Sequence, residues 1–421
     1  MAEYVDALWP GTPNGVTRAE RRSGGYRVYV PDALVGRPLM LTAERSADIA
    51  DVERQVVALN ADEHTLVGLE ALARLLLRAE AVASSFIEGL QINVRRLAKA
   101  DVAEKAGLGG YDDTARAVLG NVRAMESALS LADGGDVTVG DITELHRRLL
   151  AGTRDERWGG VIRTEQNWVG GGGVTPCTAE FVPPPPDMVP DLLDDLCAYV
   201  SGDDHPVLVQ AALAHAQFET VHPFADGNGR TGRALIHLIL RRRGLAPRFV
   251  PPLSLILASH ADAYIAGLTG SRYEGPAGSP GAQEAMGLWI DRFAADTARA
   301  CTDTERFRAE LDELETAWRG RLGRVRADSS VDLLLRALPS APVLTVATAA
   351  ELIGRSVQRA NDAIGRLVEA QVLKQTTVGR RNRAFEVPEL VQALTGFERA
   401  LASPVGDTRQ APPARPVPYR A

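Results

Sequence analysis

The stretch from His222 to Arg233 concentrates residue types that carry out phosphate chemistry. It reads His-Pro-Phe-Ala-Asp-Gly-Asn-Gly-Arg-Thr-Gly-Arg and lies between two helical patterns. A histidine in such a loop is a candidate general base for a hydroxyl group that attacks phosphorus. Asp226, four residues after the histidine, offers a hard oxygen ligand that suits Mg²⁺ bound between phosphates. The stretch therefore predicts a site for phosphoryl or nucleotidyl transfer.

The second half of this stretch predicts a helix N-terminus that binds an anion. Gly227 and Gly229 let the backbone adopt positive φ and approach a ligand closely. The helical pattern that follows begins with free N–H groups, and its dipole favours negative charge there. Arg230 and Arg233 are three residues apart and share one helix face. Two guanidinium groups beside such an anion site suit a polyphosphate.

Each of these features alone is most often a structural turn, but together they form one consistent motif. The full string His-Pro-Phe-x-Asp-Gly-Asn-Gly-Arg-x-x-Arg resembles the signature of the Fic (Fic/Doc) family and departs from it nowhere. Most of residues 45–300 is similar to this family. The resemblance implies a mainly α fold, a Fic-type helical core with a β-hairpin flap. It also implies transfer of AMP from ATP, with Mg²⁺, to a Ser, Thr or Tyr hydroxyl of a target protein.

The resemblance assigns roles to residues of this chain. It implies that His222 is the base, that Asp226 is the Mg²⁺ ligand and that Arg233 lies nearest the γ-phosphate. The family often has Asn and Tyr in its adenine pocket, and the Asn is Ser259 here, which leaves the base selectivity open. The further nucleotide-binding residues that the resemblance implies are Gly227, Asn228, Gly229, Arg230, Ser259 and Tyr264.

Residues 158–186 are too rich in Gly and Pro for a helix. Val161–Arg163 and Phe181–Val182 predict a short β-hairpin within them. This segment is similar to the family's flap, which implies that it positions the main chain of the target by β-augmentation. The residues expected to contact the target are Asn167, Trp168, Val169, Gly170 and Val174.

Ser84-Ser-Phe-Ile-Glu88-Gly89 ends an apolar helical stripe, and Gly89 suits the position after a helix end. Glu88 stands at the negative end of that helix dipole, so it is either a solvated helix end or a carboxylate with a distant partner. The string matches the Ser/Thr-x-x-x-Glu-Gly inhibitory motif of Fic proteins. The resemblance implies that Glu88 pairs with Arg233, fills the space of the γ-phosphate and, with Ser84, makes the enzyme self-inhibited.

A small C-terminal pattern predicts a winged helix-turn-helix domain. Helices are expected over 331–338, 347–353 and 356–370, and strands over 373–377 and 384–387. A basic recognition helix with a basic wing suggests DNA contact, while a protein-packing module remains the alternative. The basic residues are Arg355, Arg359, Arg366, Lys374, Arg380, Arg381 and Arg383, against the acidic Asp362 and Glu369.

The elements that must position these residues divide the chain into five expected parts. These are an N-terminal region with the inhibitory helix (1–110), a Fic catalytic core (111–300), a linker helix (301–328), the winged-helix domain (329–395) and a disordered Pro-rich tail (396–421). Within the first part, residues 1–40 are rich in Gly and Pro and predict an irregular arm.

Composition excludes several other classes of protein. With 45% apolar and 24% charged residues, the chain matches average globular usage, and its net charge of −7 disfavours a chain-wide nucleic-acid or membrane surface. The three cysteines, Cys177, Cys197 and Cys301, form no CxxC pair, which argues against structural zinc. No segment has about 18 consecutive apolar residues, so we expect no membrane partner and a cytoplasmic location. A homodimer stays open, as do a DNA-binding regulator that only senses nucleotide and transfer of a different nucleotide or phosphate group.

Overall fold

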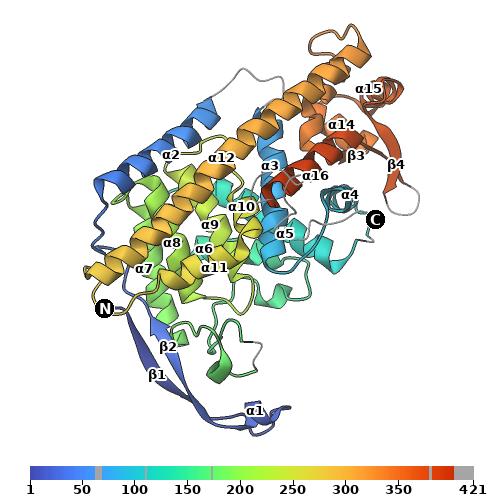
Figure 1. Cartoon of the computed structure of the whole chain (residues 1–421). Coiled ribbons are helices and arrows are strands. Elements are labelled where there is room, and N and C mark those ends of the chain that lie inside the picture. The colour runs from blue at the N-terminus through green and yellow to red at the C-terminus, as the bar shows by residue number, and fades with distance from the viewer. Residues whose placement is uncertain (62–68, 110, 172–173, 379–381, 403–421) are drawn as a thin grey trace.

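The structure, a computed structural model, describes residues 1–61, 69–109, 111–171, 174–378 and 382–402. Within them the chain is mainly helical, as predicted, with two small sheets (Figure 1). The helices are α1 (Arg18–Arg21), α2 (Ala43–Ala61), α3 (Leu69–Ile87), α4 (Val94–Lys105), α5 (Asp113–Leu131), α6 (Val139–Leu150), α7 (Val189–Ser201), α8 (Val207–Val221), α9 (Asn228–Arg242), α10 (Leu253–Ser259), α11 (Ala261–Gly270), α12 (Pro280–Leu322), α13 (Ser330–Ala337), α14 (Val346–Ile353), α15 (Val357–Glu369) and α16 (Pro388–Ala402). The strands are β1 (Glu3–Trp9), β2 (Gly24–Val30), β3 (Val343–Leu344), β4 (Lys374–Val378) and β5 (Asn382–Glu386).

Helices α8 and α9 form the centre of the core and carry the histidine-led loop between them. Every residue of α8 from Leu208 to Val221 is buried, so the helix is enclosed on all sides. Helix α9 packs against α8 and α5, and α6 packs against α5 and α9. Because both of its flanking helices are held in the core, the loop that joins them is fixed at both ends.

Helix α3 presents the predicted apolar stripe to this core. Leu72, Leu75, Leu76 and Ala79 are buried, and α3 packs against α5, α9 and α10. Helix α2 precedes α3, and residues 62–68 between them lie outside the described part. Gly89 has φ +78°, as expected of a residue that follows a helix end.

The N-terminal arm was predicted to be irregular, and this was wrong. Strands β1 and β2 pair antiparallel over their full length, and the hairpin projects from the helical body (Figure 1). The connection holds α1, whose start has a capping box made by Thr17 and Glu20. Gly and Pro mark the turns around these strands, which is why the composition suggested no regular structure.

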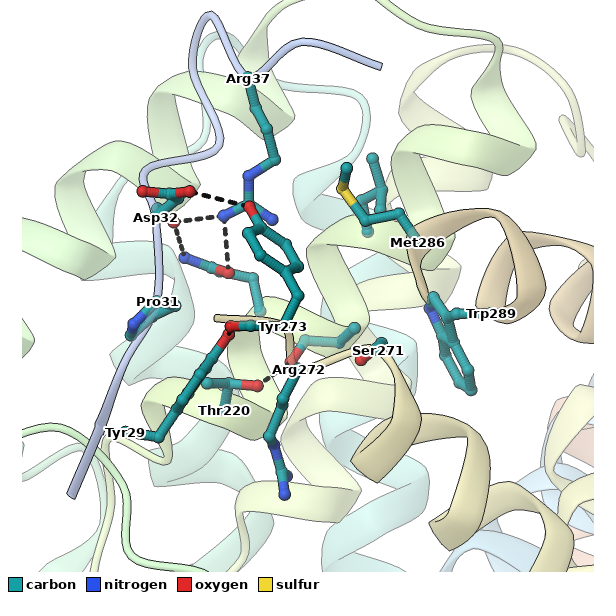
Figure 2. Close-up of a pocket in the computed structure, with 13 residues that line it drawn as sticks. Tyr29, Pro31, Asp32, Arg37, Thr220, Ser271, Arg272, Tyr273, Met286 and Trp289 are labelled. Carbon is teal, nitrogen blue, oxygen red and sulfur yellow. Dashed lines mark hydrogen bonds between the residues drawn. The ribbon is translucent and has the colours of Figure 1, made fainter. Parts of the chain in front are cut away.

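The segment after β2 is anchored to the core beside a small cavity (Figure 2). The Tyr273 hydroxyl donates to the Asp32 carboxylate at 2.9 Å, and the Asp32 carbonyl accepts from Arg37 and Gln217. Arg272 is directed away from this network in Figure 2. The cavity measures about 20 Å³, room for about one water, so it does not accommodate a nucleotide.

Helix α12 is a single 43-residue helix that joins the core to the C-terminal unit (Figure 1). It runs unbroken through residue 300, where we placed the boundary between core and linker. The long helical pattern over 284–323 therefore corresponds to one helix rather than several. None of the helices in the described ranges is long and apolar enough to cross a bilayer.

The C-terminal unit has the predicted order of helices and strands. Helices α13, α14 and α15 are followed by β4 and β5, and the short β3, which was not predicted, completes a sheet of order β3-β5-β4. Ser356 caps α15 as expected of it, whereas α14 is capped by Thr345 rather than Thr348. This unit packs on α3 and α4.

The disordered tail was predicted to begin at residue 396, and this start is too early in the chain. Residues 396–402 continue α16, and Phe397 is 7% exposed and stacks on Phe307 with ring centroids 4.4 Å apart. An aromatic side chain that is buried against the core gains enough apolar contact to order this last turn. The rest of the tail, residues 403–421, lies outside the described residues.

Candidate active site

His222 occupies the residue after the end of α8 in a left-handed conformation, with φ 49° and ψ 60°. Its ring Nδ1–H donates to the Glu219 carbonyl at 3.3 Å, so Nε2 keeps its lone pair. Burial lowers the pKa of His222 to about 4, and the ring is therefore neutral at physiological pH. A neutral imidazole with a free Nε2 has the form that a general base needs.

The start of α9 provides the predicted group of free N–H donors. Gly227, with φ +78°, is the residue before the helix. It has no side chain that could accept hydrogen bonds from the N–H groups of the first turn. The side chain of Asn228 is engaged on both sides, because its Oδ1 accepts from the Phe224 N–H at 2.9 Å and its Nδ2 donates to the Phe224 carbonyl at 2.8 Å. Asn228 therefore fixes the loop, and only its main chain remains for an anion.

The Glu88 carboxylate lies directly over these donors. A Cβ placed on Gly229 would come within 2.1 Å of Glu88 Oε1, which explains why this position holds glycine. Arg233 donates to the same Oε1 at 2.7 Å. The chain thus supplies its own anion to a site that its N–H groups and a guanidinium build.

Arg233 is held at three points by the end of α3 and by Glu88, which follows it. Besides Glu88, its Nε donates to the Ser84 hydroxyl and its terminal nitrogen to the Ser84 carbonyl, each at 2.8 Å. Burial alone would lower the pKa of Arg233, but Glu88 more than offsets this and the pKa is raised. Arg233 likewise lowers the pKa of Glu88, against the desolvation that raises it. Both side chains are therefore ionised at neutral pH.

A second carboxyl group, that of Glu219, also lies near Arg233, but it raises the pKa of Arg233 less than Glu88 does. Burial raises the pKa of Glu219 to about 7, so it is partly protonated at neutral pH. Its Oε1 has no hydrogen-bond partner within the described residues. A Cβ on Gly232 would meet this atom at 2.6 Å, which accounts for that glycine. Glu88 is therefore the main counterion of Arg233.

Asp226 and Arg230 form the open side of the site. Their side chains approach to 3.3 Å, with Arg230 5% exposed and Asp226 65% exposed. No group of three or more metal-ligating side chains gathers within the described ranges. A single accessible carboxylate beside a phosphate site nevertheless fits Mg²⁺, which keeps several waters and takes its other ligands from phosphates.

Sequence reasoning missed Arg163, which holds the main chain of the loop. Its side chain is buried and donates to the carbonyls of His222 at 2.9 Å, Val221 at 3.2 Å and Pro184 at 2.6 Å. Burial lowers its pKa to about 10, so it stays charged at neutral pH. The available signal was an arginine in an apolar Val-Ile-Arg run, and only the fold shows which carbonyls it meets.

His146 of α6 was also missed. Its ring connects Gly160, near the start of the flap segment, to the histidine-led loop through hydrogen bonds. The Gly160 N–H donates to Nδ1 at 2.9 Å, so Nε2 carries the proton and donates to the Asp226 carbonyl, also at 2.9 Å. The ring stacks on Phe224 at 3.8 Å. Burial lowers its pKa to about 4, which keeps this neutral tautomer.

The predicted pairing within the flap was wrong. Ile162 forms a bridge with Phe224 of the loop, and Phe181 pairs with Val169 instead. The two segments of the expected hairpin thus find partners that lie elsewhere in the chain. The flap is consequently attached to the loop by main-chain contact rather than folded on itself alone.

The expected target-binding residues divide into two groups. Asn167 donates to the carbonyls of Phe224 at 3.1 Å and His222 at 3.3 Å, so its side chain faces the loop, and Trp168 packs edge-on against Trp9 at 6.0 Å. The exposed ones are Val169, Gly170 and Val174. Gly172 and Gly173 lie outside the described residues.

The two residues expected in the adenine pocket are both buried. Tyr264 is 3% exposed, and its hydroxyl is 2.7 Å from His215 Nε2. Ser259 is 5% exposed and donates to the Leu255 carbonyl at 2.8 Å. These contacts leave neither hydroxyl free for a base in this conformation, and the assignment of both to the adenine pocket stays a prediction.

Comparison with known families agrees with this geometry. Residues 136–240 match the Fic/DOC family, and residues 47–130 match the Fic/DOC family N-terminal region. Two regions of the chain, residues 47–130 and 136–240, are thus similar to the Fic/DOC family. The histidine-led loop lies in the first matched part and Glu88 in the second, so the contact between Glu88 and Arg233 joins the two Fic regions.

Several curated relatives share these regions. The protein adenylyltransferase Fic of Drosophila willistoni is 34% identical over 222 residues, which are 49% of this chain and 42% of that protein. The protein adenylyltransferase fic-1 of Caenorhabditis elegans is 35% identical over 133 residues, 31% of this chain and 24% of that protein. The chain thus spans less than half the length of the relatives it matches.

Solved structures of Fic proteins also resemble the chain. A Fic family protein from Desulfovibrio desulfuricans G20 superposes with a TM-score of 0.49 at 20% identity, covering 83% of this chain and 97% of that chain. Fic-1 from Caenorhabditis elegans has a TM-score of 0.45 at 22% identity, covering 62% and 72%.

Proposed function

We propose that the chain is a self-inhibited protein adenylyltransferase that moves AMP from ATP to a Ser, Thr or Tyr hydroxyl of a target protein and of itself. The observation that carries this proposal is the Glu88 carboxylate, which lies over Gly229 and pairs with Arg233. In an inhibited ATP site, we expect a carboxylate of the chain itself to occupy the place of a phosphate. The curated relatives named above are protein adenylyltransferases, and the proposal extends that activity to this chain.

The transfer step uses the free nitrogen of His222. Nε2 removes the proton of the target hydroxyl, whose oxygen forms a bond to the α-phosphorus of ATP. The bond from that phosphorus to its bridging oxygen breaks, and pyrophosphate leaves. The N–H groups at the start of α9 stabilise the charge of the reacting phosphate, while Arg233 binds the outer phosphate. Mg²⁺, when bound at Asp226, neutralises phosphate charge.

Glu88 opposes this step by competing with the γ-phosphate for Arg233. Two anions in one site repel each other, and the buried Arg233 can pair closely with only one of them. ATP whose γ-phosphate is displaced has its α-phosphorus out of line with the attacking hydroxyl, and small misplacements of reacting atoms cost large factors in rate. We therefore assign Glu88 as the inhibitory residue, with Ser84 as the second anchor of Arg233.

Partners and compartment follow as further parts of the proposal. The target is a protein with an accessible hydroxyl group, and the exposed part of the flap binds it. The chain is also a candidate to form a homodimer. We place the protein in the cytoplasm, because its three cysteines are free, as is usual in a reducing compartment.

The deciding experiment measures transfer from labelled ATP with Mg²⁺ by the full chain. We expect Glu88→Gly to raise incorporation strongly, and Glu88→Gly combined with His222→Ala to abolish it. Mass spectrometry with each NTP identifies the group transferred, since AMP, UMP, GMP and phosphate add different masses. Equal labelling by wild type and Glu88→Gly would remove the inhibitory role. No labelling by any His222-intact protein would favour a core that only senses nucleotide.

A further inference from the structure

Helix α15 presents a face that the fold leaves uncovered. It packs on α13 and α14 through Ala360, Ala363, Ile364 and Leu367, which are all buried. Figure 1 shows α15 at the outer edge of the C-terminal unit, away from α8 and α9. Its opposite side faces outward, so what covers that side in a complex must come from another molecule or from solvent.

Three arginines form one stripe along this outer side. Arg359 and Arg366 are seven residues apart, which places them on one face of α15, and Arg355 directly precedes the capping Ser356; all three are exposed. Lys374 at the start of β4 and Arg383 of β5 are exposed as well. The predicted Arg380 and Arg381 lie outside the described residues.

These cations lack the acidic partners that arginines have elsewhere in the chain. Arg233, Arg292 and Arg319 each form an ion pair with a carboxylate. Within the described residues no ion pair involves the five basic residues of α15, β4 and β5. Asp362, the acid within the stripe, accepts from Gln358 at 3.0 Å instead. The arginines therefore form no ion pair among the described residues, while the exposed Asp362 and Glu369 of the same helix offset part of their charge.

The N-terminus of α15 adds a second, independent feature. Ser356 caps the helix, and the first two helical residues, Val357 and Gln358, are both exposed. Val357 is 61% exposed although it is apolar, so it contributes little to the core. In helices that enter the major groove, the first residues meet base edges: an apolar side chain contacts a thymine methyl group and glutamine contacts adenine.

We propose that the outer face of α15 binds duplex DNA, with its N-terminus in the major groove. Arg355, Arg359 and Arg366 bind backbone phosphates and set the register, and Val357 and Gln358 read base edges. Unpartnered cations beside one apolar residue fit DNA better than an acidic protein surface, because protein interfaces depend on a larger buried apolar centre. This inference concerns a site separate from the nucleotide loop and does not depend on AMP transfer.

The test measures binding of the full-length protein to a labelled duplex of random sequence by fluorescence anisotropy, between about 50 and 200 mM salt. We expect affinity to fall steeply with salt, and Arg359→Ala to weaken binding and reduce the slope of log K against log salt by about 1. Arg54→Ala is the matched control, since Arg54 is exposed on α2 and paired with Asp51. It should change neither quantity.

Base reading is tested separately by selecting preferred sequences from the random pool. We expect Val357→Ser and Gln358→Ala to alter the preferred sequence while the salt slope stays the same. Thermal unfolding of each variant verifies that the exposed substitutions leave the fold intact. Binding that is insensitive to salt, or an equal loss with Arg54→Ala, would overturn the proposal. So would binding of an acidic protein at this face without binding of DNA.

Discussion

The arginines of the loop and those of α15 have opposite surroundings. Arg233 is 1% exposed and bonded to Glu88 and Ser84, whereas Arg359 is exposed and forms no ion pair within the described residues. A buried charge interacts strongly with its neighbours, while water and salt screen an exposed one. The same residue type therefore occurs in two settings: Arg233 is paired inside the protein with the carboxylate that we propose competes with a phosphate, and Arg359 faces solvent, where we propose that it binds DNA.

The largest effect should come from removing the competitor's charge alone. Glu88→Gln keeps the size of the side chain, and we expect it to raise AMP incorporation by about ten- to a thousand-fold, because the ion pair with the buried Arg233 is lost. Glu70→Gln is the matched control, since Glu70 on the same helix pairs with Arg74 at an exposed site. Similar rates for both variants would show that burial of the pair does not matter.

Loosening the loop should have the next largest effect. In Glu88→Gly protein, we expect Arg163→Ala to lower kcat by about a hundred-fold, because the carbonyls of His222 and Val221 lose their donor. Arg163→Lys should restore part of the loss. The measurement is steady-state transfer at several ATP concentrations. A change in KM for ATP with kcat unaltered would contradict a positioning role.

We expect the transfer rate to fall only at unusually low pH. Burial lowers the pKa of His222 from 6.5 to about 4, so the base stays neutral as pH falls and is lost only near pH 4. We expect transfer by Glu88→Gly protein to be level from neutral pH down to about pH 5 and to fall below it. The free energy of unfolding also decreases as the pH falls from about 6.5 toward 4, because His222 binds a proton near pH 6.5 in the unfolded chain but only near pH 4 in the folded one. Circular dichroism at each pH separates the two effects, and a fall in rate centred on pH 6.5 with intact fold would contradict the assignment.

The smallest effect should come from the exposed arginine. We expect Arg359→Ala to change the free energy of unfolding by less than about 0.5 kcal/mol, because no partner is left unpaired. Transfer by Glu88→Gly protein should also be unchanged by it. Urea denaturation and the labelling assay measure the two quantities. A large loss of stability would show that α15 is tied to the fold more tightly than its exposure indicates.

Local patterns in the sequence predicted much of this molecule. Apolar spacing located the end of α3, and local patterns predicted the order of α13, α14, α15, β4 and β5. These features depend on residues within one or two helical turns, so their physics is complete in a short window. The same holds for the loop motif, whose glycines and arginines are adjacent in the chain.

Non-local contacts account for the errors. The strand pairing of the flap was wrong because Ile162 pairs with Phe224, sixty-two positions along the chain. Arg163 and His146 were missed because their partners are main-chain groups that the fold brings close. No pattern of side chains in the sequence identifies a carbonyl as a partner, since every residue has one.

The order of residues alone determined which groups take part: a base, a carboxylate and two guanidinium groups in one loop, and an acid followed by glycine at a helix end. Only the tertiary structure decided that this acid lies over the start of α9 and that the arginines of α15 form no ion pair with any residue that the structure describes. The reason is physical. Residue type sets the charge a group can carry, whereas packing sets how near the opposite charge lies and how much water remains between them.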